Sequence, residues 1–112
     1  MTDQFHAAKL NAIRQSEFFR DLDEAVLREI EHEFKQVTLE PGAYVFREGE
    51  AGDSMYIVGR GKVRVCGTAE DGSEVLIDEH SVGACVGEIA LLTGQPRTAT
   101  VYTLQASDLI QL

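Results

Sequence analysis

The chain has no tryptophan, only two cysteines and two prolines, and ten basic residues against nineteen acidic ones. Two cysteines, Cys66 and Cys85, cannot form the disulfide framework of a small secreted domain, and they lack metal-ligand spacing. The net charge of −9 argues against a surface for nucleic acid or membranes. No apolar run approaches the roughly 18 residues of a membrane span, and no charged-then-apolar leader opens the chain. The polar start Met1 to Gln4 and the few cysteines therefore predict a cytoplasmic protein in a reducing compartment.

A length of 112 residues, 44% of them hydrophobic, is enough for one compact domain with one core. Residues 1–35 are expected to form an N-terminal helical segment. A second helix in it is expected to begin at Asp21, because Glu24 follows three residues later. Apolar residues at helical spacing predict the faces turned to the core: Phe5, Leu10, Ile13 and Phe18 in the first helix, and Leu22, Val26, Leu27, Ile30 and Phe34 in the second.

Residues 36–112 show the pattern of short β-strands. The β-rich runs are residues 37–39, 44–46, 55–58, 63–66, 74–77, 99–102 and 109–112, with glycine-rich turns between most of them. Such strands at roughly 8–12-residue spacing predict an antiparallel sandwich or jelly roll, here mainly β with flanking helices. A short helical run at 88–92 interrupts the strands, and an element that breaks the architecture is expected to serve function.

The segment 87–100 combines a small-residue turn, a carboxylate, a short helix and a lone arginine. Backbone N–H groups at a helix start near Gly87 favour an anion. Ionised Glu88 only accepts hydrogen bonds, so it suits a sugar hydroxyl and not a phosphate. Arg97 offers a planar fork of donors that matches phosphate oxygens. The pattern predicts a binding site for a small molecule that carries both a sugar hydroxyl and a phosphate.

This segment resembles the phosphate-binding cassette of cyclic-nucleotide-binding domains, G-E-x-A-L-L followed by R-[TSA]-A-[TS]. The likeness extends over about residues 12–112. Residues 40–50 match the family's P-G…F-x-E-G-E entry, and residues 52–63 match its G-D-x-x-Y-I-V…G-x-V hairpin. The resemblance implies an eight-stranded double-stranded β-helix, or jelly-roll barrel, with a short cassette helix. One departure is Cys85-Val86 where the family commonly has phenylalanine before G-E.

The resemblance also implies residue roles. Gly87 and Ala90 would present backbone N–H groups to the cyclic phosphate, Glu88 would bind the ribose 2′-hydroxyl, and Arg97 would bind an exocyclic phosphate oxygen. Thr98 would add a hydroxyl to the phosphate or the base. The remaining pocket residues are expected to be Val65, Ile77, Val86, Ile89 and Ala99.

The implied ligand is cAMP or cGMP, with a lean to cAMP, and neither a metal nor a further cofactor is expected. The domain would sense this ligand allosterically in signal transduction and control a C-terminal effector. The family's lid and dimerisation helices would lie beyond Leu112, and a homodimer could form through such a helix. The chain is accordingly expected to be an N-terminal excerpt of a longer protein.

Several alternatives stay open. Glu88 and Arg97 could form a structural ion pair, or the domain could be degenerate and serve protein interaction. It could equally be the regulatory module of a multidomain enzyme such as a patatin-like esterase, or of a DNA-binding regulator of the catabolite-activator type.

Catalysis within the domain is not expected. Ser54 and Ser81 lie in turn-like contexts without a nearby basic partner, and no acid–base pair is visible. His6, His32 and His80 lack metal-ligand spacing, and His80 is expected to be a surface strand residue. The two cysteines are expected to be small buried or half-buried fillers.

Overall fold

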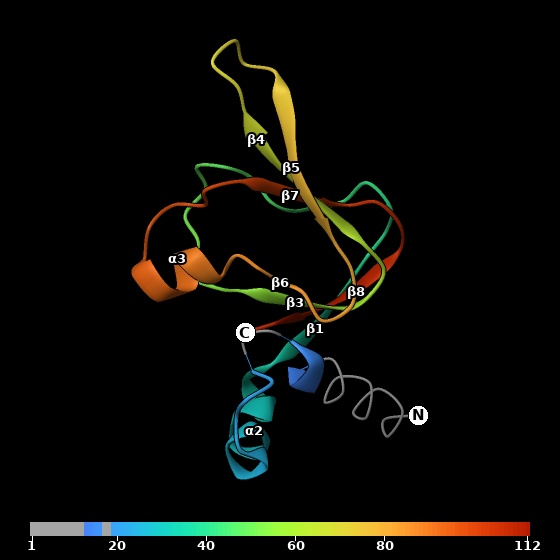
Figure 1. Cartoon of the computed structure of the whole chain (residues 1–112), viewed down its shortest axis with the longest axis vertical. Coiled ribbons are helices and arrows are strands. Elements are labelled where there is room, and N and C mark those ends of the chain that lie inside the picture. The colour runs from blue at the N-terminus through green and yellow to red at the C-terminus, as the bar shows by residue number, and fades with distance from the viewer. Residues whose placement is uncertain (1–12, 17–18) are drawn as a thin grey trace.

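The computed structural model describes residues 13–16 and 19–112 (Figure 1). Two four-stranded antiparallel sheets, in the orders β1-β8-β3-β6 and β2-β7-β4-β5, stack as a jelly roll and do not close into a continuous barrel. This confirms the predicted mainly β class with flanking helices. The elements are α2 (Glu24–Ile30), η1 (Glu31–Glu33), β1 (Lys35–Leu39), β2 (Tyr44–Phe46), β3 (Tyr56–Arg60), β4 (Val63–Thr68), β5 (Glu74–His80), β6 (Cys85–Val86), α3 (Glu88–Thr93), β7 (Thr100–Thr103) and β8 (Ser107–Gln111).

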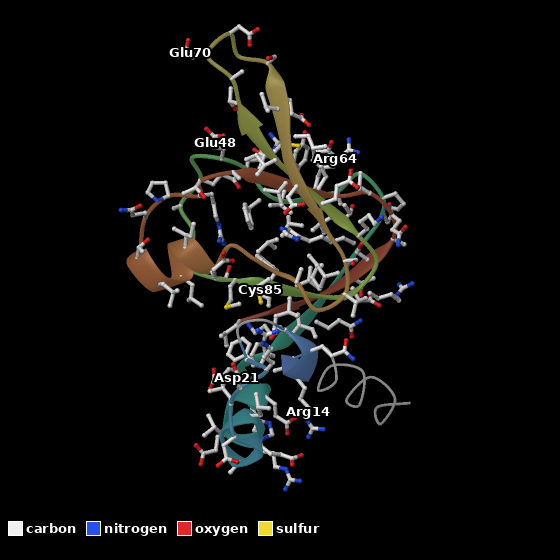
Figure 2. The ribbon with its side chains drawn as sticks, viewed as in Figure 1. Arg14, Asp21, Glu48, Arg64, Glu70 and Cys85 are labelled. Carbon is white, nitrogen blue, oxygen red and sulfur yellow. The ribbon has the colours of Figure 1, made fainter. Side chains whose placement is uncertain are left out.

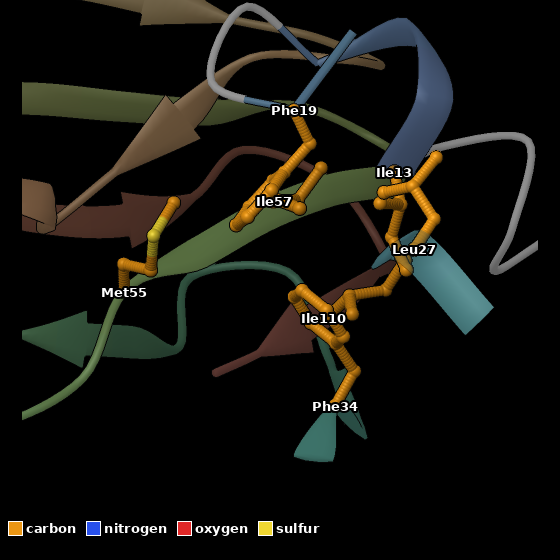
Figure 3. Close-up of a cluster of buried hydrophobic side chains, with 7 residues drawn as sticks. All are labelled: Ile13, Phe19, Leu27, Phe34, Met55, Ile57 and Ile110. Carbon is orange, nitrogen blue, oxygen red and sulfur yellow. The ribbon is translucent and has the colours of Figure 1, made fainter. Parts of the chain in front are cut away.

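The space between the sheets is filled by side chains from the inward positions of the strands. This cluster consists of Phe46, Val58, Val63, Val86, Val101 and Leu109. Because successive strand residues point to opposite faces, Ile57 and Ile110, the neighbours of Val58 and Leu109, face the other way. They join a second cluster beneath the helical segment: Ile13, Phe19, Leu27, Phe34, Met55, Ile57 and Ile110 (Figure 3). Strands β3 and β8 are therefore covered on both faces.

The second helix differs from the prediction at its start and on one side. Asp23, not Asp21, caps α2, because its carboxylate accepts a hydrogen bond from the Ala25 N–H at 3.3 Å. Leu27 and Phe34 are buried as predicted, whereas Leu22 and Val26 are 40% and 41% exposed. In Figure 1, α2 extends away from the sheets, so only part of its apolar side meets them.

Some sequence-based predictions fall outside the described residues or need correction. Phe5, Leu10, Phe18 and the side chain of Ile30 lie outside what the structure describes. The two-residue strand β6 was absent from the predicted strands, since a pair of residues is too short to show alternation. No helix in the described ranges is long and apolar enough to cross a membrane.

Strand β5 is the free edge of its sheet and extends with β4 as a hairpin beyond the rest of the fold (Figure 1). Six of its seven residues are exposed, and only His80 at its end is partly covered. The β4–β5 register shifts between Val65 and Cys66. A register shift of this kind changes the direction in which nearby side chains point. Here it places Val65 and Ile77 in the wall of the same hollow.

Candidate functional site

A hollow of about 240 Å³ opens between α3, the β4–β5 pair and the segment before β7. All ten predicted site residues line it. The full lining is Phe46, Val65, Ile77, His80, Cys85, Val86, Gly87, Glu88, Ile89, Ala90, Arg97, Thr98, Ala99 and Val101. Phe46, His80, Cys85 and Val101 are lining residues that the sequence did not predict. For Phe46 and Val101, inward alternation along their strands was the available signal.

Gly87 shapes the start of α3. Its φ of +82° lies in the left-handed region, which glycine adopts without steric cost. A Cβ at this position would lie 2.7 Å from Nη1 of Arg97 and 3.0 Å from Cε2 of Phe46. The absence of a side chain at Gly87 therefore lets the backbone, the guanidinium and the Phe46 ring meet in one place.

Arg97 is buried, with 6% of its surface exposed. Its Nη1 donates to the carbonyl oxygens of Ser54 at 2.7 Å and Gly87 at 3.1 Å, and its Nη2 donates to Oγ of Ser54 at 3.0 Å. Its Cζ lies 4.2 Å from the centroid of the Phe46 ring. The expectation that Ser54 has no basic partner is thus wrong, because that partner is 43 positions away in sequence.

The charge of Arg97 has no counter-ion among the described residues. Within residues 13–16 and 19–112, no carboxylate lies within ion-pair distance of its guanidinium. Carbonyl and hydroxyl oxygens satisfy some of its N–H groups but leave its positive charge uncompensated. Because burying a charge is costly without a partner ion, this arrangement favours an anionic ligand.

Glu88 is the acceptor of the site. Its Oε2 is buried and accepts no hydrogen bond from any described residue. A buried oxygen without a donor costs about 1–3 kcal/mol in general, and more when it is charged. Since Glu88 and Arg97 are not paired, the structural ion-pair alternative is wrong. The hollow therefore holds a separate unpartnered acceptor and an uncompensated cation.

The rest of the hollow is largely apolar. Val86 and Ala99 are buried, whereas Ile77 and Ile89 are 59% and 45% exposed at the opening. Thr98 is exposed, and its hydroxyl makes no hydrogen bond with the part of the chain that the structure describes. Such a wall suits the faces of a flat aromatic ring.

His80 and the cysteines do not form a metal site. Among the described residues, no group of three or more histidine, cysteine or acidic side chains is placed to hold a metal ion. His80 lines the hollow, with Nε2 3.7 Å from Oδ2 of Asp78, so it is not the simple surface residue that was expected. Cys66 is buried and Cys85 is half-buried, as expected of fillers, and neither belongs to a disulfide in the described part of the chain.

These features define a β-domain with a hollow whose lining suits an anionic, hydroxyl-bearing molecule with an apolar part. The sequence profile of the family described as "Cyclic nucleotide-binding domain" matches residues 36–112. The chain belongs to the cyclic nucleotide-binding domain family. The domain is thus regulatory and not catalytic.

Relatives with this domain differ in the rest of their chains. The chain is 36% identical over 109 residues to a cyclic nucleotide-gated cation channel protein of Drosophila melanogaster, covering 92% of this chain and 16% of that protein. It is 32% identical over 87 residues to the neuropathy target esterase sws of Drosophila grimshawi, covering 78% of this chain and 6% of that one. The chain therefore spans only a small part of these relatives.

A solved structure supports the fold. The regulatory domain of Toxoplasma gondii PKA with cAMP superposes with a TM-score of 0.88 at 32% identity, covering 95% of this chain and 40% of that one. The jelly roll and its cassette helix are thus the architecture of PKA regulatory domains.

Proposed function

We propose that the hollow binds a cyclic purine nucleotide, cAMP in preference to cGMP, and reports its occupancy to an effector in the same protein. One observation carries the proposal: the buried, uncompensated guanidinium of Arg97 shares a pocket with the unpartnered Glu88 oxygen. A cyclic nucleotide supplies the two missing partners, a phosphate anion and a ribose hydroxyl.

The phosphate would occupy the end of the pocket formed by Gly87, Ala90 and Arg97. Arg97 would supply charge and a directional pair of donors. The small residues Gly87 and Ala90 would allow the phosphate to approach the backbone closely. Ala90 is buried, at 3% exposure. Its methyl group is small, so it takes up little of the space that the phosphate would fill.

The ribose would lie against Glu88. Its 2′-hydroxyl would donate to the carboxylate and satisfy the buried Oε2. The two charged side chains would therefore bind different groups of one ligand. A noncyclic nucleotide carries a larger, more highly charged phosphate and would fit the Gly87 end less well.

The base would pack against the apolar wall of Val65, Ile77, Val86, Ile89 and Ala99. The preference for cAMP is supported by the likeness to a regulatory domain whose structure was solved with cAMP. Thr98 lines the hollow and is exposed, its hydroxyl makes no hydrogen bond with a described residue, and a guanine amino group would be a suitable partner for it if cGMP were bound.

The signal would pass through α3. Glu88 and Ala90 of this helix line the pocket, and Leu91 packs on the cluster that joins the N-terminal helices to the sheet. A ligand that draws α3 toward the phosphate would therefore change how these helices pack. The size of the signal is set by the ligand's difference in affinity for the two arrangements.

Isothermal titration calorimetry of the 112-residue chain with cAMP, cGMP and 5′-AMP tests the proposal. We expect one site per chain, with affinity in the order cAMP, cGMP, 5′-AMP. Absence of heat and of any thermal shift at millimolar cAMP and cGMP would reject nucleotide sensing in favour of an interaction role. Tighter binding of cGMP would overturn only the base assignment.

The effector is a separate question. The esterase relative supports a regulatory module of a patatin-like esterase as a second candidate, beside a transcription regulator or a channel. The full coding sequence discriminates among these, through a G-x-S-x-G context, a helix-turn-helix or membrane-spanning helices. That Cys66 and Cys85 are not disulfide-bonded supports a reducing, cytoplasmic setting for this domain.

A further inference from the structure

Ser54 contacts Arg97 with two oxygens at once. Its carbonyl accepts from Nη1 at 2.7 Å, and its hydroxyl accepts from Nη2 at 3.0 Å. Ser54 is itself buried, at 7% exposure. It lies just before β3, so the contact is anchored to the central part of the fold. Ser54 therefore accepts a hydrogen bond from each of the two terminal nitrogens, Nη1 and Nη2, of the guanidinium.

These contacts leave a defined set of donors. A guanidinium has five N–H groups: two on Nη1, two on Nη2 and one on Nε. Both Nη1 hydrogens are used, toward Ser54 and Gly87, and one Nη2 hydrogen is used, toward the Ser54 hydroxyl. The second Nη2 hydrogen and the Nε hydrogen lie side by side on one edge. That edge is a complete fork for two oxygens of one phosphate.

The faces of the guanidinium are covered as well. The Phe46 ring lies against it, with its centroid 4.2 Å from Cζ. The backbone of Gly52 is so close that a Cβ there would lie 2.6 Å from Cζ and 2.8 Å from Cδ of Arg97, and nearer still to Nε. Nearly equal distances to these bonded atoms place Gly52 over the plane of the group and not at its edge. No hydrogen bond to a described residue uses Nε or the second Nη2 hydrogen, and Arg97 lines the hollow, so the Nε–Nη2 edge is the part of the group left for a ligand.

We propose that Ser54 is a positioning residue, whose hydroxyl and carbonyl hold Arg97 so that the Nε–Nη2 edge is presented to the phosphate. The inference rests on the proposed function and specifies how its key cation is oriented. Without the hydroxyl, the guanidinium would keep its charge but turn more freely about its long axis. Affinity would then fall less than on loss of Arg97, and discrimination between the two exocyclic phosphate oxygens would fall with it.

The binding test compares Ser54→Ala with Ser54→Thr, which keeps a hydroxyl, and with Ser107→Ala, which removes a buried hydroxyl that contacts Lys62 and Gln105 instead. We expect Ser54→Ala to weaken cAMP binding roughly tenfold, the scale of one hydrogen bond to a charged group. Ser54→Thr should restore most of the affinity, and Ser107→Ala should leave it unchanged.

Two further readouts separate positioning from a merely structural effect. The ratio of affinities for the Rp and Sp phosphorothioates of cAMP should move toward one in Ser54→Ala, and the ratio for cAMP over 2′-deoxy-cAMP should stay constant. The double variant with Arg97→Ala should bind no more weakly than Arg97→Ala alone. An unchanged Rp/Sp ratio, or losses that multiply in the double variant, would overturn the proposal.

A measurement without ligand distinguishes this proposal from the proposed function. Nitrogen-15 NMR of the guanidinium should show slow exchange of the Arg97 Nη groups in the wild-type chain and in Ser54→Thr, and faster exchange in Ser54→Ala. Equal exchange in all three would reject the role of Ser54 whether or not nucleotide binds. Slow exchange in a chain that binds no nucleotide would reject the proposed function and leave the restraint on Arg97 intact.

Discussion

The pocket and the outer face of the β2-β7-β4-β5 sheet each hold an arginine, in opposite electrostatic settings. We define the outer face as Arg64, Cys66, Glu74, Glu79 and Tyr102. Arg64 is beside the β4–β5 pair in Figure 2 and forms an ion pair with Glu79, at 2.7 Å from Nη2 to Oε2. Hydrogen bonding to Glu79 raises the pKa of Arg64 above its usual value. Arg97, in contrast, is buried, and no carboxylate of a described residue lies within ion-pair distance of it.

The other polar groups of the outer face are hydrogen-bonded to one another. The Tyr102 hydroxyl and the Cys66 thiol both donate to Oε1 of Glu74, at 3.2 and 3.0 Å. Burial, reinforced by the hydrogen bond to Glu74, raises the pKa of the Cys66 thiol and keeps it protonated as a donor. The charged groups of the outer face thus find their partners within the chain. The structural Arg64 thus has its counter-ion on the neighbouring strand, whereas the pocket Arg97 has none among the described residues.

The largest expected effect is the loss of the pocket arginine. Arg97→Ala should weaken cAMP binding by about 1.5–3 kcal/mol, the range for a hydrogen bond to a charged group. The matched variant Arg64→Ala, on the outer face, should leave the affinity unchanged. Calorimetric titration of both variants checks this. Similar losses in both would mean that Arg97 is not distinguished from a structural arginine.

The next effect concerns the space available for a side chain at two glycines, one in the pocket and one in the β4–β5 turn. Gly87 and Gly72 both have positive φ, +82° and +87°, but only at Gly87 would a Cβ meet other atoms within 4 Å. Gly87→Ala should therefore destabilise the fold by about 1–2 kcal/mol more than Gly72→Ala, the scale of overpacking. Urea unfolding of both variants measures the difference. Equal destabilisation would show that Arg97 and Phe46 give way at no cost.

The third effect concerns the contact between Glu88 and the ribose. Removal of the ribose 2′-hydroxyl should cost affinity in the wild-type chain and less in Glu88→Gln, with a coupling of about 1 kcal/mol, because a neutral amide oxygen still accepts a weaker hydrogen bond. Glu79→Gln on the outer face serves as the control and should show no coupling. Titrations with cAMP and 2′-deoxy-cAMP complete the cycle. Equal losses for 2′-deoxy-cAMP in wild type and Glu88→Gln would remove this role.

The smallest effect is a pH dependence outside the pocket. Asp108 accepts from Nε of Arg60 at 2.6 Å and from the Thr38 hydroxyl at 2.9 Å, which lowers the pKa of its carboxyl group. A carboxyl with a lowered folded-state pKa adds stability above its unfolded-state pKa, and this stability is lost as pH falls through the folded-state value. The pair is partly exposed, so solvent screening keeps the effect small.

Asp108→Asn should therefore flatten the loss of thermal stability between about pH 5 and pH 2 and leave cAMP affinity at neutral pH unchanged. Circular dichroism melts at several pH values measure the first, and calorimetry measures the second. An identical acid slope in both chains would show that this ion pair contributes nothing to stability.

The sequence was most informative where function depends on neighbours in the chain. The motif at 87–99 contains seven of the ten predicted pocket residues, and a single turn and helix bring most of them together. It was less informative where a contact joins distant segments. The Ser54–Arg97 pair spans 43 positions, and His80 is placed by its pairing with the buried Val63, which is distant in sequence.

The helical segment shows the same limit. Apolar spacing correctly predicted that Leu27 and Phe34 are buried. The same spacing could not show that α2 extends away from the sheets and leaves Leu22 and Val26 exposed. The spacing gives the apolar side of a helix, but not how much of that side the sheets cover. The sequence also did not distinguish Asp21 from Asp23 as the N-cap of α2, because both carry a carboxylate that can accept a hydrogen bond from the first turn.

The most direct test of the central claim is a crystal structure of the chain grown with saturating cAMP. We predict one nucleotide in the hollow, with phosphate oxygens on the Nε–Nη2 edge of Arg97, the 2′-hydroxyl on Glu88, and Ser54 still bound to the other edge. An empty hollow, or a nucleotide whose phosphate lies away from Arg97, would contradict the account.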